Sequence, residues 1–146
     1  MQIPGSTYDD VLVPTDGSDP AERAVDRGLA VADRHDATVH ALFVVDEARY
    51  GATPALSSYE LALEQVEERG ESLTADVAGR ARDRGLDATT VVTRGHPHEE
   101  ITDYAERQDV DLVVLARVGG GHVESPHLGS TTDRVVRTTG VPVFIA

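Results

Sequence analysis

The chain has 146 residues, a length that suits one domain, and we find no internal boundary in it. It contains no cysteine, which excludes disulfides and thiolate metal sites. Its 26 acidic residues outnumber 13 basic ones, all of them arginine, and the net charge of −13 argues against a nucleic-acid-binding surface because it repels phosphates.

The same numbers bear on where the protein works. No apolar run approaches the ~20 residues that span a bilayer, and residues 1–7 lack the basic and apolar stretches of a secretion signal. We therefore expect a cytoplasmic protein without a membrane partner, with residues 1–7 as a flexible N-terminal arm and residues 8–146 as a single domain. We interpret the acidic excess as a solvated surface adapted to a salt-rich, halophilic cytoplasm. At about 1 M salt the Debye length is only ~3 Å, so the repulsion among the acidic side chains is screened.

The first predicted element is a short apolar strand at residues 10–15. Residues 16–18 (DGS) make a turn. Asp19, Pro20 and Glu22 then carry helix-start signals: a capping acid, a proline at the first helical position, and a glutamate three residues after the cap. The apolar residues that follow recur every three or four positions and predict an amphipathic helix. They are Ala21, Ala24, Val25, Gly28, Leu29 and Ala32.

The remaining elements alternate in the same way. Further strands are expected at residues 38–45, 88–93, 112–116 and 142–146, with a loop at residues 46–54. Further helices are expected at residues 57–84, from Pro97 onward with an inner face of Ile101, Tyr104 and Ala105, and at residues 131–139. Strands that alternate with helices predict an α/β fold, a doubly wound, three-layer structure whose parallel sheet is covered on both faces. Ligands bind such sheets beyond the carboxyl ends of the strands, where the strand order reverses.

Two loops that follow predicted strands carry the residues with chemistry. In the first, Asp16 can accept hydrogen bonds from a ribose diol, or it can simply cap the following turn. The second runs from Ala116 through a glycine-rich stretch to Gly129, Ser130 and Thr131, and it leads straight into a helix. Glycines let main-chain N–H groups approach a phosphate, and a helix N-terminus adds positive charge and unpaired donors. A flexible loop with a serine cap gives the same pattern.

Nearly the whole chain, residues 11–146, resembles the universal stress protein family. The resemblance includes the VPTDGS loop at residues 13–18, the Gly-x-Pro-x-Glu-x-Ile run at residues 95–101, and the VDLVVL strand at residues 110–115. The closing VPVFIA, residues 141–146, also looks like the family's last strand.

The most specific part of the resemblance is the family's nucleotide motif. It spaces glycine, two residues, glycine, nine residues and glycine before serine or threonine. Gly119, Gly129 and Ser130 hold the last three positions at this spacing, whereas Ala116 stands at the first. Arg117, which follows, is a candidate phosphate partner or a solvated arginine.

The resemblance implies a strand order of 3-2-1-4-5, so that the order reverses between the first and fourth strands. It also implies an ATP site. Asp16 would bind the ribose. Main-chain groups of Pro14, Thr15 and Val44 would frame the adenine and sugar, next to Ala116. Gly119, Gly129, Ser130 and Thr131 would hold the phosphates. A Mg²⁺ ion could be bound together with the triphosphate. A homodimer through the last strand is implied as well.

Three functions stay open at this point: a ligand-regulated stress-response module that binds ATP, a slow ATP hydrolase, and a dimeric interaction protein with a vestigial pocket. We predict no catalytic residue, because neither a positioned base nor a lysine or arginine clamp is evident, and this ranks hydrolysis below binding. Four histidines invite a metal site, but no compact carboxylate or cysteine set completes one, so no metal site is predicted. They are His96, His98, His122 and His127.

Overall fold

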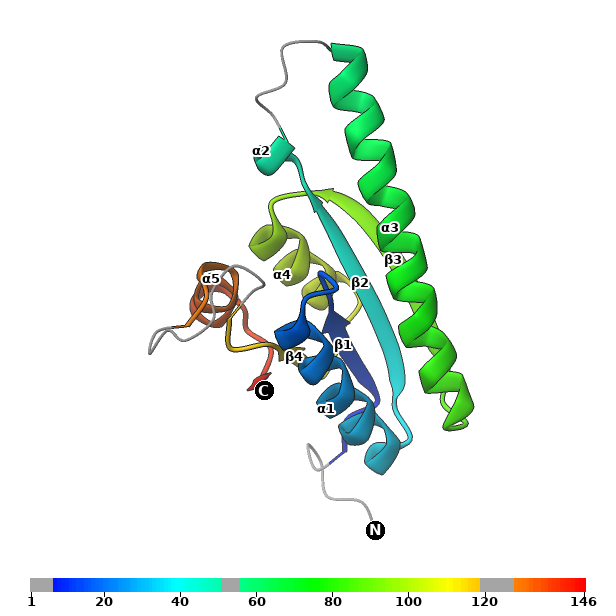
Figure 1. Ribbon diagram of the computed structural model, residues 1–146. Helices are drawn as coiled ribbons and strands as arrows, with labels where there is room; N and C mark the ends of the chain where they lie inside the picture. Colours follow the sequence, from blue (N-terminus) through cyan, green and yellow to red (C-terminus); the bar gives the residue numbers. More distant parts are fainter. Residues whose placement is uncertain (1–6, 51–55, 119–127) are drawn as a thin grey trace.

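The computed structural model describes residues 7–50, 56–118 and 128–146. The predicted N-terminal arm, residues 1–7, lies outside these ranges except for Thr7. Five parallel strands form one sheet in the order β3-β2-β1-β4-β5 (Figure 1). They are β1 (Asp10–Pro14), β2 (Thr38–Asp46), β3 (Ala88–Gly95), β4 (Leu112–Leu115) and β5 (Val143–Ile145). The predicted α/β fold and strand order are confirmed.

Helices cover both faces of this sheet (Figure 1). On one face lie α1 (Asp19–His35) and α3 (Leu56–Asp83), and on the other lie α4 (Pro97–Arg107) and α5 (Ser130–Thr138). Right-handed crossovers explain the arrangement, because the chain steps outward from β1 to β3 and then returns to β4 and β5 over the opposite face. The doubly wound, three-layer prediction is therefore confirmed, and all strands end at one edge of the sheet.

Strand β1 shows why both faces are covered. Its side chains alternate, so Val11 and Val13 enter the core beneath α1 while Leu12 enters the core beneath α4. All three are 0% exposed, and burying one such side chain contributes about 1.5–3 kcal/mol. Gly28 brings α1 close to the strand, since a Cβ there would lie 2.8 Å from Val13 Cγ2. The end of β1 is thus held firmly from two sides.

The start of α1 differs from the sequence prediction. Ser18, not Asp19, is the N-cap, and its Oγ accepts a hydrogen bond from the Ala21 N–H at 3.3 Å. Asp19 is already helical, and Pro20 stands in the first turn. The physical reason is that a serine one residue earlier offers a short hydroxyl to the N–H of the third helical residue, Ala21, and caps about as well as aspartate.

Other element ends also shift. The predicted loop at residues 46–54 begins with Asp46, which still belongs to β2, and continues with the short helix α2 (Glu47–Tyr50). A single helical turn has no apolar periodicity that could reveal it. At the last helix, Ser130 rather than Thr131 is the first residue and Gly129 is the N-cap, so a serine cap there is wrong. The remaining ends differ by one or two residues, as fraying ends commonly do.

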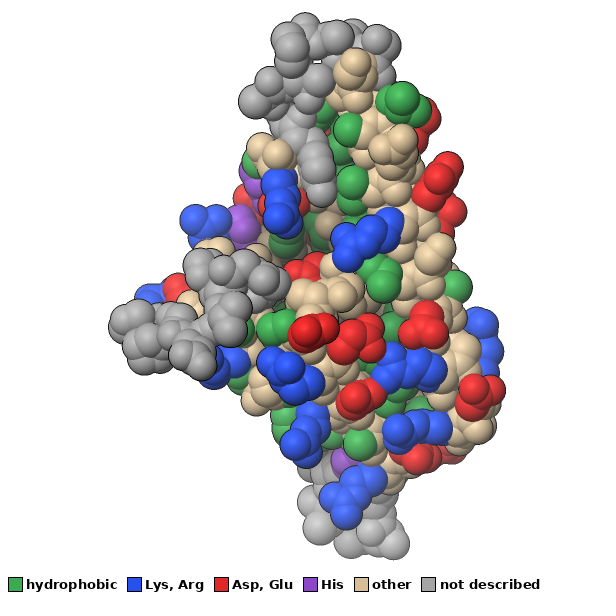
Figure 2. Space-filling view, in the orientation of Figure 1, with side chains coloured by type: hydrophobic (Ala, Val, Ile, Leu, Met, Phe, Trp, Pro, Cys, Tyr) green, Lys and Arg blue, Asp and Glu red, His purple; other side chains and the backbone are tan. Residues whose placement is uncertain are grey.

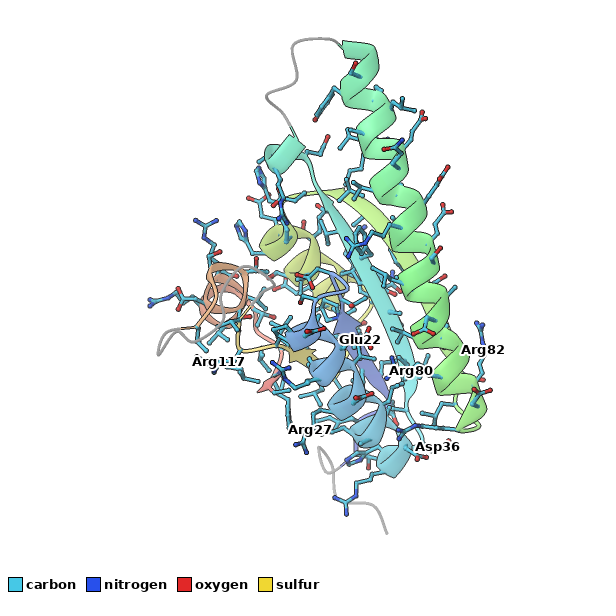
Figure 3. All side chains as sticks on the ribbon, in the orientation of Figure 1. Glu22, Arg27, Asp36, Arg80, Arg82 and Arg117 are labelled. Carbon is cyan, nitrogen blue, oxygen red and sulfur yellow. The ribbon has the colours of Figure 1, made fainter. Side chains whose placement is uncertain are left out.

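The surface of the α1 and α3 face is highly charged. Figure 2 shows acidic and arginine side chains side by side over the lower part of these helices. Arg80 of α3 reaches Glu22 of α1 at 3.1 Å (Figure 3) and also pairs with Asp26. Within the described ranges, no helix is both long and apolar enough to cross a membrane.

Candidate functional site

A cavity of about 480 Å³ opens at the carboxyl ends of β1, β2 and β4. Its volume falls in the range of about 300–1,000 Å³ that small-molecule and cofactor sites usually occupy. The strand order reverses between β1 and β4, so the cavity lies where ligand sites of doubly wound sheets are expected.

The cavity is lined by every predicted nucleotide-site residue that the structure describes. They are Pro14, Thr15, Asp16, Val44, Ala116, Gly129, Ser130 and Thr131. Gly119, the remaining predicted residue, lies outside the described ranges. The ends of β1, β2 and β4 and the beginning of α5 thus meet in one place, although they are far apart in the sequence.

The turn after β1 is held by several hydrogen bonds. Asp16 Oδ1 accepts from the Ser18 N–H at 2.9 Å, and Thr15 Oγ1 accepts from the Gly17 N–H at 3.2 Å. Gly17 has φ +81°, a left-handed conformation that favours glycine. The Thr15 N–H also donates to the Leu42 carbonyl at 2.9 Å, which ties the turn to β2. Asp16 therefore does cap the turn, and its exposed carboxylate stands at the cavity.

The second side of the cavity is the N-terminus of α5. Gly129 is buried, and its N–H donates to the Arg117 carbonyl at 2.8 Å. Thr132 Oγ1 donates to the Ala116 carbonyl at 2.7 Å, so the first turn of the helix is pinned to the end of β4. A glycine N-cap has no side chain to accept from the N–H groups of that turn. The first turn of α5 consequently presents main-chain donors and a partial positive charge at the cavity.

The residues after β4 depart from the family motif without distorting the main chain. The described non-glycine residues with positive φ are Asp36 and Asp109, so Ala116 is not strained by its β-carbon. Val118 is buried and lines the cavity. Arg117 is not among the described residues that line it, so the lining lends no support to a phosphate contact from this side chain.

Sequence reasoning missed three charged residues of the lining. Arg69 comes from α3, and its Nη2 donates to the Asp16 carbonyl at 3.2 Å, which braces the turn from outside. Asp46 ends β2, and Arg49 lies on α2. No local pattern marks these residues, because their approach to the cavity depends on how α2 and α3 pack against the sheet.

The histidines do not form a metal site in the part of the chain that the structure describes. The rings of His96 and His98 lie 6.2 Å apart at the start of α4. Within the described ranges, no three side chains of histidine, cysteine, aspartate or glutamate gather closely enough to hold a metal ion. His122 and His127 lie outside those ranges.

With the fold and cavity established, comparison with known proteins decides the family. The model of the universal stress protein family matches residues 7–146. The chain belongs to the universal stress protein family. The match takes in both loops that line the cavity, so the predicted membership is confirmed.

Relatives of this universal stress protein agree with that assignment. Universal stress protein MJ0531 of Methanocaldococcus jannaschii is 33% identical over 94% of this chain and 81% of its own length. The solved structure of MJ0577, from the same organism, has a TM-score of 0.86 at 26% identity and is covered to 96%, as is this chain. A universal stress protein solved in complex with cAMP has a TM-score of 0.68 at 25% identity, covering 97% of this chain and 98% of that one.

Proposed function

We propose that this universal stress protein binds ATP in the cavity at the strand ends and acts as a ligand-regulated stress-response module. One observation carries the proposal: the Asp16 turn and the N-terminus of α5, which has no side-chain cap, line the same cavity. Together they offer an acceptor for a sugar and donors for phosphate, which are the two polar requirements of a nucleotide.

The phosphates belong at the first turn of α5. A helix N-terminus carries about half a positive charge and unpaired N–H donors, so it attracts anions. Gly129 lets the main chain approach closely, and the Ser130 and Thr131 hydroxyls add donors. The net charge of −13 repels an anionic ligand at long range. The attraction from the helix N-terminus therefore has to act on the phosphates at close contact. A Mg²⁺ ion would be held by phosphate oxygens and water, since the described residues form no metal cage.

The ribose and base occupy the rest of the cavity. The Asp16 carboxylate accepts hydrogen bonds from ribose hydroxyls, and its turn is already fixed by Ser18, Leu42 and Arg69. A fixed turn lowers the entropic cost of binding. Apolar side chains from β2 and α4 also line the cavity, among them Val44 and Ile101, and they suit the faces of a base. The cAMP-bound relative supports the assignment because cAMP also contains adenosine.

Titration with ATP by isothermal calorimetry tests the proposal. We expect the wild-type protein to bind and Gly129→Val to lose binding, because the valine side chain fills the space that the phosphates need. Gly140→Val is the matched control, since Gly140 is exposed and a Cβ there meets nothing within 4 Å. Gly140→Val should bind as the wild type does. Equal affinity in Gly129→Val and wild type would refute this placement of the phosphates.

The same samples separate the alternatives. ADP that accumulates over hours in the wild type, but not in Gly129→Val, would make the protein a slow hydrolase. If the folded wild-type protein does not bind ATP at all, the remaining alternative is a dimeric interaction protein with a vestigial pocket.

We also propose that the protein forms a homodimer through β5. In the described residues β5 pairs only with β4, so its other edge is open. Phe144 and Ile145 are each 40% exposed on this strand, which is unusual for large apolar side chains at an open edge. Sedimentation velocity should give twice the chain mass for the wild type and the single chain mass for Ile145→Asp. A wild-type protein that sediments as a monomer at high concentration contradicts the dimer.

A further inference from the structure

On the basis of the proposed nucleotide site, we infer that Arg69 of α3 is a positioning residue for the ligand. Its guanidinium holds the peptide group between Asp16 and Gly17 in one of two available orientations. Only that orientation presents the Asp16 carboxylate, already fixed in place, to a ribose. Arg69 acts through Asp16 and not through a contact of its own with the ligand.

Both ends of this peptide group are hydrogen-bonded to side chains. The Asp16 carbonyl accepts from Arg69 Nη2 at 3.2 Å. The Gly17 N–H, at the other end of the same peptide group, donates to Thr15 Oγ1 at 3.2 Å. Thr15 is buried, whereas Arg69 is exposed. The peptide group is thus held from the core at one end and from α3 at the other.

The glycine makes a second orientation available. Gly17 has φ +81°, and glycine adopts positive and negative φ about equally well, so the peptide group before it can turn over at little steric cost. Turning over exchanges the directions of the carbonyl and the N–H. The Gly17 N–H would then face the guanidinium of Arg69, and a donor would face donors. Arg69 therefore favours the observed orientation and opposes the reversed one.

The orientation of the peptide group determines how the Asp16 carboxylate is held. Asp16 Oδ1 accepts from the Ser18 N–H at 2.9 Å, and the ring that this bond closes contains the peptide group in question. Reversal would displace the Ser18 N–H from the carboxylate oxygen. Asp16 lines the cavity, so a ligand would then have to order its side chain on binding. The affinity falls by the fraction of molecules that are no longer ready to bind.

Arg69 projects from a firmly packed part of α3. A Cβ at Gly17 would lie 2.8 Å from Arg69 Nη2 and 2.9 Å from Leu73 Cδ1, so both side chains lie directly against the turn. Leu73 also packs against an apolar cluster that contains Phe43 of β2. A Cβ at Gly70 would overlap the Phe43 ring, which shows how closely α3 approaches β2 here (Figure 1). The donor that holds the Asp16 carbonyl is therefore itself held in place.

Calorimetric titration of Arg69→Met with ATP and with adenosine tests the inference. Methionine keeps an unbranched stem but removes the donors and the charge. We expect both ligands to bind more weakly by the same factor, about 3- to 10-fold, because both contain the ribose that Asp16 holds. A loss of electrostatic attraction alone would weaken ATP and leave adenosine, which is uncharged, unchanged. Arg69→Lys restores the charge and a donor, and it should bind with an affinity between those of Arg69→Met and the wild type.

Arg82→Met is the matched control. Arg82 is an exposed residue of the same helix outside the cavity lining, and its Nη2 also donates to a main-chain carbonyl, that of Ala88, at 3.1 Å. The substitution removes the same charge and a similar hydrogen bond. Arg82→Met should therefore bind both ligands as the wild type does.

The amide signal of Gly17 in NMR spectra reports on the peptide group directly. In the ligand-free protein, we expect this signal to be shifted or broadened in Arg69→Met but not in Arg82→Met. Saturating ATP should return it to its position in the wild-type complex, because the bound ribose selects the same orientation. A role of Arg69 in overall stability alone would not produce this pattern.

Each outcome decides the inference. Equal affinities of Arg69→Met and the wild type overturn it, as does a loss confined to ATP or a loss that Arg82→Met shares. An unchanged Gly17 signal in ligand-free Arg69→Met overturns it whether or not the protein binds nucleotides. If the folded wild type binds neither ATP nor adenosine, the proposed function fails and takes this inference with it.

Discussion

Among single residues, Asp16 has two roles. Its side chain accepts from the Ser18 N–H, and its carbonyl accepts from Arg69, so the residue that faces the cavity is also part of what fixes the turn. The two readings that the sequence left open, a turn cap and a ligand contact, are therefore compatible. A variant that removes the whole side chain affects both, and one that keeps an acceptor separates them.

We expect Asp16→Ala to weaken ATP binding by about 1–3 kcal/mol, the cost of leaving polar partners unpaired. Asp16→Asn keeps an oxygen for the Ser18 N–H and should lose less. Calorimetry measures both, and Asp19→Ala, exposed and outside the cavity lining, is the control. Wild-type affinity in Asp16→Ala would show that the carboxylate does not contact the ligand.

A second residue-scale feature lies at the other end of the sheet. His40 on β2 is buried, with its Nδ1 2.6 Å from the Tyr104 hydroxyl and its Nε2 2.8 Å from Asp10 Oδ1. Burial, and then the negative charge of Asp10, raise the pKa of the Tyr104 hydroxyl above its ordinary value of 10.0. The folded chain thus keeps this proton to a higher pH than the unfolded chain does.

The sign of the resulting pH dependence follows. The contribution of Tyr104 to stability is complete below pH 10.0 and is lost as pH rises through the raised pKa. Urea unfolding between about pH 8 and pH 11 should show the free energy of unfolding falling above pH 10, with a smaller fall in Tyr104→Phe. An identical fall in both proteins would assign it to other groups.

At the scale of single elements, the cap of α1 is the clearest case. Ser18→Ala removes the acceptor for the Ala21 N–H and should lower the free energy of unfolding by about 1 kcal/mol. Ser72→Ala, at an exposed position within α3, is the control and should cause no loss. Urea denaturation compares them, and equal stability of Ser18→Ala and wild type would contradict the cap.

The elements also show what the sequence could and could not predict. Long periodic helices and apolar strands were found because their pattern is local: the buried residues of α4 are Ile101, Tyr104 and Ala105, as predicted. The short α2 was missed because one turn has no period. The loops of the site were found from the strand-end rule and the family motif. Arg69 and Asp46 were not, because their part in the cavity is set by packing between distant segments.

For the molecule as a whole, the main feature is the excess of acidic side chains. Arginines are outnumbered two to one, 13 against 26 acidic residues, yet some bridge several carboxylates at once. Arg80 pairs with Glu22, Asp26 and Asp76, and so joins α1 to α3 (Figure 3). Pairs at the surface are each worth only about 0–1 kcal/mol, so they do not offset the repulsion among the remaining acids.

Stability should therefore rise with salt. The Debye length shrinks from ~30 Å at 0.01 M to ~3 Å at 1 M, which screens the repulsion within the folded chain. Thermal melts followed by circular dichroism should show an increasing Tm from low to molar KCl. NaCl serves as the control and should act alike, because screening depends on ionic strength. A flat response would argue against a surface adapted to salt.

We propose that an adenosine nucleotide lies between the Asp16 turn and the N-terminus of α5. A titration of the ¹⁵N-labelled protein with ATP, followed by the amide signals in NMR spectra, tests this placement. We predict that the largest shifts occur at Asp16, Gly17, Gly129, Ser130 and Thr131, with little change around His40 and Tyr104 at the opposite end of the sheet. Saturating ATP that leaves the signals of these five residues unmoved, or that moves those around Tyr104 instead, would contradict this placement of the nucleotide.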